Sequence, residues 1–206
     1  MSLQVTFHRP EPEAIADMRT RKKARTRVAI QDAALDLFAE QGYDATPVEQ
    51  IALRADVSAS TFFRYFGTKA DIILNDHDSQ LPQLCAAVRS QPPEIRDLEA
   101  VRRALQAAWV PNIDPVRTIR TARAVGQSAF LCGVAYNVGR GWVDAVAAAL
   151  VERRADPDAL EECLLIARTA LGVFGGATEH WALSGAKEDF DALIDEGFKL
   201  IERMCL

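Results

Sequence analysis

The 206-residue sequence predicts an all-α fold, in which a small N-terminal three-helix domain with a helix-turn-helix precedes a larger helical domain. Apolar residues recur at helical spacing from about residue 21, and helix start and stop residues divide this pattern into segments. No alternating strand pattern competes with helix after residue 69. We expect residues 1–18 to form a disordered leader, residues 19–68 the three-helix domain and residues 69–206 the larger domain.

The first predicted helix begins near Arg21 and ends before Gly42. Gly42 occupies the place of a left-handed C-cap, and Tyr43 follows as an apolar residue that can pack on the last turn. The buried face of this helix consists of apolar side chains three and four residues apart, namely Ile30, Ala33, Ala34, Leu37 and Phe38.

A short second helix is predicted to start at Thr46. Thr46 can act as its N-cap, Pro47 suits the first helical position, and Glu49 completes a capping box. A tight turn at residues 55–57 then ends the helix. Asp56 in this turn tolerates a left-handed backbone better than most residues do.

The third predicted helix begins near Ala59, with Ser58 as its N-cap. Phe62 and Phe66 lie four residues apart on it and should point into the core, and Gly67 ends it. Two short helices joined by a tight turn form a helix-turn-helix, in which the second helix enters the major groove of DNA.

The larger domain is predicted to be helical throughout. Thr68 and Asp71 provide the start signal of its first helix. The predicted helices cover approximately residues 69–89, 94–109, 115–125, 130–153, 157–183 and 188–204.

The net charge of -5 conceals a basic segment. Residues 19–75 carry nine Lys or Arg against seven Asp or Glu, whereas residues 76–206 carry fourteen against nineteen. The stretch TRKKARTR, residues 20–27, holds five basic residues and no acid. Such an arm on an acidic protein indicates contact with a polyanion, although a charge run taken alone also fits a solvated tail.

The sequence contains no motif that indicates an enzyme, a metal site or a cofactor. Nucleophile–base pairs, phosphate-binding loops and paired carboxylates are missing from it. Its four cysteines are far apart, which favours reduced thiols without metal. No apolar run reaches the roughly 18–20 residues of a membrane span, and no secretory signal begins the chain. We therefore expect a cytoplasmic protein.

The stretch LDLFAEQGYDATPVEQIALRADVSASTFFRYFGTKADII resembles the DNA-binding domain of the TetR family of transcriptional regulators. The resemblance covers about residues 24–75. Together with the basic arm, it implies that DNA is contacted by Arg25, Arg27, Thr46, Ser58, Ala59, Ser60, Thr61, Phe63, Arg64, Tyr65 and Lys69.

These expected contacts divide between phosphates and bases. Hydroxyls at helix N-termini and the ammonium of Lys69 are expected to meet phosphates. Arg64 is the only long donor on the third helix and could bind guanine or a phosphate. Ala59 cannot donate a hydrogen bond to a base, and Phe63 stands where a phosphate-binding tyrosine is common in the family. Asp56 likewise replaces the usual glycine of the turn.

For the larger domain, the resemblance implies a homodimer formed through the last two helices and an effector pocket among the middle helices. Arg117, Arg120 or Arg123 is available for an anionic group of the effector. Aromatic residues at helical spacing are also typical of an ordinary core. The residues predicted to line the pocket are Trp109, Arg120, Phe130, Tyr136, Asn137, Trp142, Phe174 and His180.

The sequence therefore predicts a ligand-responsive, DNA-binding transcriptional regulator. We expect a homodimeric repressor that leaves a pseudo-palindromic, double-stranded DNA operator when a small, largely apolar effector binds. A transcriptional activator and a helical interaction module that has lost DNA binding remain alternatives.

Overall fold

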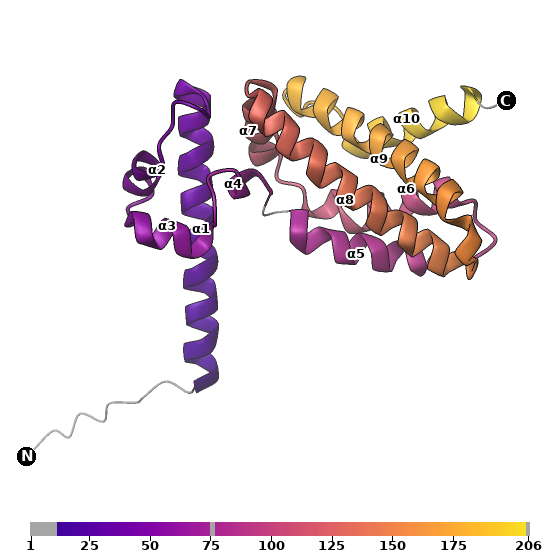
Figure 1. The fold of residues 1–206 in the computed structure, drawn as a ribbon, viewed down its shortest axis with the longest axis horizontal. Coiled ribbons are helices and arrows are strands. Elements are labelled where there is room, and N and C mark those ends of the chain that lie inside the picture. The colour runs from indigo at the N-terminus through magenta and orange to yellow at the C-terminus, as the bar shows by residue number, and fades with distance from the viewer. Residues whose placement is uncertain (1–11, 75–76, 205–206) are drawn as a thin grey trace, which may run out of the picture.

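A computed structural model describes residues 12–74 and 77–204, which are helical with no strand, as predicted (Figure 1). Two short 3-10 turns, Val110–Asn112 and Pro157–Ala159, join some of the helices. The helices are α1 (Pro12–Gln41), α2 (Val48–Arg54), α3 (Ala59–Tyr65), α4 (Asp71–Leu74), α5 (His77–Arg89), α6 (Asp97–Ala108), α7 (Pro115–Gly126), α8 (Ala129–Arg154), α9 (Leu160–Leu183) and α10 (Phe190–Met204). None of these described helices is long and apolar enough to cross a bilayer.

Helix α1 is longer than predicted. It begins at Pro12 rather than near Arg21, so residues 12–18 of the expected disordered leader are helical. Proline suits the first turn of a helix, and no Gly or Pro interrupts the chain from there to Gln41. The rest of the expected leader, residues 1–11, lies outside the described residues. The N-terminal half of α1 projects well past α2 and α3 (Figure 1).

Helices α1–α4, which we call the head, enclose their own core. The predicted inward face of α1 is buried, and Phe62 and Phe66 are 0 % and 1 % exposed. Ile72 and Ile73 of α4 belong to the same core, so this core includes residues beyond residue 68, the expected end of the three-helix domain. The cause is that α4 folds back onto α1, where the Gln31 side chain donates a hydrogen bond to the Ile72 carbonyl.

Helices α5–α10, which we call the body, pack around a second core. Helix α8 packs against α5 and α9, and α9 also packs against α6, α7 and α10. Asp97 at the start of α6 is buried between Arg153 and Arg154 at the end of α8, which ties these two helices together. The helix predicted over residues 69–89 is present as α4 and α5, with residues 75–76 between them outside the described residues.

The corner between α7 and α8 joins the body to the head. Ala124 and Leu131 from this corner are buried in the head core. Arg120 of α7 forms an ion pair with Asp36 of α1, with 3.1 Å between nitrogen and oxygen. Helix α1 therefore contacts both α2 of the head and α7 of the body.

Candidate nucleic-acid interface

The turn between α2 and α3 has the geometry of a helix-turn-helix. Asp56 has a φ of +54°, so this aspartate adopts the left-handed conformation expected of it. The turn is closed by a hydrogen bond of 2.9 Å from the Val57 amide to the Ala52 carbonyl. Ser58 caps α3 as predicted, because its Oγ accepts a hydrogen bond of 3.1 Å from the Thr61 amide.

One face of α3 is open to solvent. Ser60 and Arg64 are exposed, and the Phe63 side chain is 53 % exposed, whereas Phe62 on the opposite face is buried. The Arg64 guanidinium carbon lies 5.5 Å from the centre of the Tyr65 ring. The remaining predicted contacts on this helix are half-buried, namely Ala59, Thr61 and Tyr65. The exposed face therefore offers hydroxyls, one aromatic ring and one guanidinium to a partner.

Thr46 does not have the predicted position. It is fully buried, and Pro47 rather than Thr46 is the N-cap residue of α2. The Thr46 hydroxyl donates a hydrogen bond of 2.7 Å to the Gly42 carbonyl. Gly42 has a φ of +84°, and this left-handed turn directs Thr46 inward onto the end of α1. In this structure Thr46 closes the corner between α1 and α2, and its hydroxyl is not presented to a phosphate.

Lys69 is also engaged within the head. Its ammonium donates hydrogen bonds to the carbonyls of Tyr43 at 2.6 Å and Thr46 at 2.8 Å. It lies 4.0 Å from the centre of the Tyr43 ring. Burial lowers the pKa of Lys69, and the Asp44 carboxylate opposes this shift. Two of the three N–H groups are used, so a phosphate contact depends on the third.

The two arginines predicted in the basic arm lie in different surroundings. Arg27 is half-buried, and its guanidinium carbon lies 5.1 Å from the centre of the Phe66 ring. Arg25 is exposed on α1. Sequence reasoning missed Lys22, which lies three residues before Arg25 on the same helix face. Testing the basic run for helical spacing would have identified this pair.

The eight residues predicted to line an effector pocket are not brought together by the structure. Trp109, Trp142 and Phe174 are buried in the body core, where the Trp109 ring centre lies 4.6 Å from that of Trp142 and 5.4 Å from that of Phe174. Arg120 is paired with Asp36. The other four residues are exposed, namely Phe130, Tyr136, Asn137 and His180. The helical spacing of aromatic residues does not by itself distinguish residues of a core from residues between head and body or residues of a pocket.

Phe130 belongs to the joint between head and body. Its ring stacks on that of Tyr43, with 5.7 Å between the ring centres. Tyr43 is the residue whose carbonyl and ring contact Lys69. Phe130 therefore connects the start of α8 to the corner that carries α2.

Helices α9 and α10 present apolar side chains to solvent. Part of the expected dimer face is buried within the chain, since Ala167 and Phe174 lie in the body core. Other large apolar side chains on these helices are half or more exposed, namely Leu165, Leu183, Leu200 and Met204.

Cys85, Cys132 and Cys163 are free thiols, and Cys205 lies outside the described residues. Within residues 12–74 and 77–204, no group of three or more His, Cys, Asp or Glu side chains is placed to hold a metal ion.

Comparisons with known proteins agree with this geometry. Residues 30–75 match the sequence model of the bacterial regulatory proteins of the TetR family. MftR of Mycobacterium tuberculosis, a proposed transcriptional regulator of mycofactocin biosynthesis, is 30 % identical over 164 residues, which are 78 % of this chain and 82 % of MftR. The similarity to MftR thus covers a larger share of the chain than the family model does.

Solved structures share the fold over both parts of the chain. NalD, the secondary repressor of the MexAB-OprM efflux pump in Pseudomonas aeruginosa, superposes with a TM-score of 0.59 at 19 % identity, covering 89 % of this chain and 96 % of NalD. FadR of Bacillus subtilis, solved in complex with stearoyl-CoA, gives a TM-score of 0.57 at 20 % identity, covering 84 % and 96 %.

The position of Lys69 generates a first prediction. Replacing Lys69 with methionine removes the donor from the Tyr43 and Thr46 carbonyls, and we expect the free energy of unfolding to fall by about 1–3 kcal/mol. Urea denaturation followed by circular dichroism measures this change. Lys187→Met is the control, because Lys187 is exposed. Equal stability of the two variants would show that Lys69 does not hold the corner.

Proposed function

The chain belongs to the TetR family of bacterial transcriptional regulators, and we propose that it is a repressor that binds a pseudo-palindromic DNA operator as a homodimer. The observation that carries this proposal is the exposed face of α3, which belongs to a head with its own buried core. The family consists of DNA-binding regulators, and we propose no enzymatic activity. The proposed location is the cytoplasm, where the operator DNA lies.

Arg64 is the proposed reader of sequence. Helix α3 would lie in the major groove while α2 crosses the backbone. Arg64 is exposed on α3, and a guanidinium matches the two acceptors of guanine. Ser58, Ser60 and Thr61 would contribute hydroxyl contacts beside it. Phe63 lacks a hydroxyl and would offer an apolar contact, such as one with a thymine methyl group.

The proposed dimer forms through α9 and α10. A single helix-turn-helix makes few base contacts, so two half-sites are needed for adequate specificity. The exposed apolar side chains on these two helices favour a self-complementary interface there. The dimer would place two copies of α3 at a spacing that matches one or more turns of DNA.

The proposed effector is small and largely apolar, and it enters the body beside Trp109, Trp142 and Phe174. These rings meet where α6, α8 and α9 pack together. This proposal is supported by FadR of Bacillus subtilis, which shares the fold and was solved in complex with stearoyl-CoA, a ligand with a long apolar chain. A shift of α7 and α8 would reach α1 through the pairs Arg120–Asp36 and Phe130–Tyr43, and would thereby change the position of the head.

Selection of bound duplexes from a random pool tests whether the protein binds DNA in a sequence-specific way. We expect the pool to yield a pseudo-palindromic site, for which Arg64→Ala weakens binding by about 1–3 kcal/mol, roughly 5- to 150-fold, and relaxes the preference at one base pair per half-site. Arg54→Ala is the matched control, because two hydrogen bonds of 2.8 Å hold Arg54 on Glu40. If the random pool yields no preferred DNA sequence, the protein is not a sequence-specific DNA-binding regulator.

Candidate apolar metabolites test the proposed release. A true effector should change the tryptophan emission of the protein, because Trp109 and Trp142 lie in the proposed site. It should also weaken operator binding about tenfold or more at constant salt, which corresponds to about 1.4 kcal/mol of coupling. A compound that binds the body but leaves operator affinity unchanged would contradict the coupling.

A further inference from the structure

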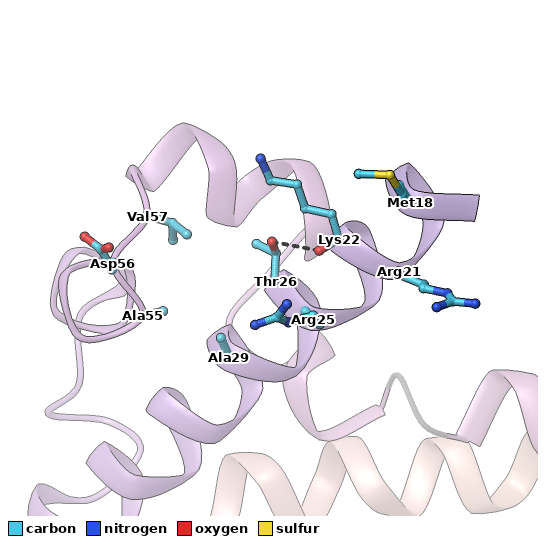
Figure 2. A pocket seen from close by; sticks show the side chains of 9 residues that line it. All are labelled: Met18, Arg21, Lys22, Arg25, Thr26, Ala29, Ala55, Asp56 and Val57. Carbon is cyan, nitrogen blue, oxygen red and sulfur yellow. Dashed lines mark hydrogen bonds between the residues drawn. The ribbon is translucent and has the colours of Figure 1, made fainter. Parts of the chain in front are cut away.

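A groove separates the N-terminal half of α1 from the turn between α2 and α3 (Figure 2). Its volume is about 670 Å³. The side chains that line it come from one face of α1 and from the turn, namely Met18, Arg21, Lys22, Arg25, Thr26, Ala29, Ala55, Asp56 and Val57. Three of these nine are basic, and only Asp56 is acidic.

Two of the three basic side chains of the groove lie on the side of α1 that faces the turn, whereas Arg21 extends the other way (Figure 2). Lys22 and Arg25 are exposed, and both extend from α1 toward the side of the turn (Figure 2). The Asp56 carboxylate points away from α1 (Figure 2). Between these walls lie small or apolar side chains such as Ala29 and Val57. A basic rim over an apolar floor complements a chain in which phosphates alternate with sugars.

The position of the groove relates it to the reading helix. The turn that forms one wall runs directly into Ser58, the N-cap of α3. The N-terminal end of the recognition helix is the end that contacts bases in a helix-turn-helix complex. The DNA that flanks the base pairs contacted by α3, on the side of the helix N-terminus, would therefore lie next to the projecting half of α1 (Figure 1).

The spacing of the basic side chains matches a DNA strand. Lys22 and Arg25 are three residues apart on α1, about 4.5 Å along the helix axis at a rise of 1.5 Å per residue. Successive phosphates of one strand lie about 3.4 Å apart along the duplex axis. Lys22 and Arg25 can thus meet about two phosphates at the same time.

We propose that this groove seats the sugar–phosphate backbone of operator DNA just outside the half-site that α3 reads. The proposal rests on the proposed function and extends it. The helical α1 arm lengthens the footprint of each head on DNA and adds phosphate contacts that carry no sequence information. It gives Lys22 and Arg25 a role that Arg19 and Lys23, which do not line the groove, do not share.

Two duplexes and two variants test this proposal. The short duplex ends at the outer edges of the selected half-sites, and the long duplex continues by about one turn, roughly 10 base pairs, on each side. The groove variant combines Lys22→Gln with Arg25→Gln. The control variant combines Arg19→Gln with Lys23→Gln, which removes the same charge from exposed positions of α1 that do not line the groove. Glutamine keeps a helix propensity close to that of lysine and arginine.

We expect the wild-type protein to bind the long duplex more tightly than the short one. Each head adds about two phosphate contacts, so the dimer adds about four, which raise the salt slope by about 3.6. The preference for the long duplex should therefore fall about 150-fold between 50 and 200 mM salt. The groove variant should lose both the preference and the additional slope, whereas the control variant should keep them. Circular dichroism and the dimer mass verify that both variants are folded.

Two results would overturn the proposal. One is equal loss of the preference in the groove and control variants, which would indicate general attraction by the arm. The other is a wild-type protein that binds both duplexes with the same affinity and salt slope. Failure of the random pool to yield any site would instead count against the proposed function, so the two failures are distinguishable.

Discussion

The ammonium of Lys69 is the contact on which the reading surface depends. It joins the carbonyls of Tyr43 and Thr46, which lie between α1 and α2, to the segment that leads into α4. The position of α2 is thereby fixed relative to α1, and α3 follows through the turn at Asp56. The Tyr43 ring also stacks on Phe130 of the body. The same corner therefore sets the shape of the head and receives the body.

Ion pairing explains how an acidic protein can present a surface for DNA. Several carboxylates of the head are bound to partners within the protein. Asp36 is paired with Arg120, Glu40 with Arg54, and Asp71 accepts hydrogen bonds from Thr68. The basic residues of α1 remain on the projecting half of the helix. The local charge that DNA would meet thus differs in sign from the net charge of -5.

Local patterns in the sequence predicted the helices because each depends on neighbouring residues. The caps at Gly42 and Ser58 and the buried face of α1 were predicted in this way, and all are present. The inward position of Thr46 and the internal contacts of Lys69 depend on how separate segments meet, which spacing does not reveal. The places of the predicted effector residues depend on the same kind of contact: Trp142 lies in the body core, while Phe130 stacks on Tyr43 between head and body.

A crystal structure of the protein with a long duplex carrying the selected site would test the central claim most directly. We expect α3 to lie in the major groove with Arg64 at a base edge, and the backbone of the flanking DNA to lie between Lys22 or Arg25 and the α2–α3 turn. DNA bound through another face of the head, or flanking DNA that bends away from α1, would contradict it.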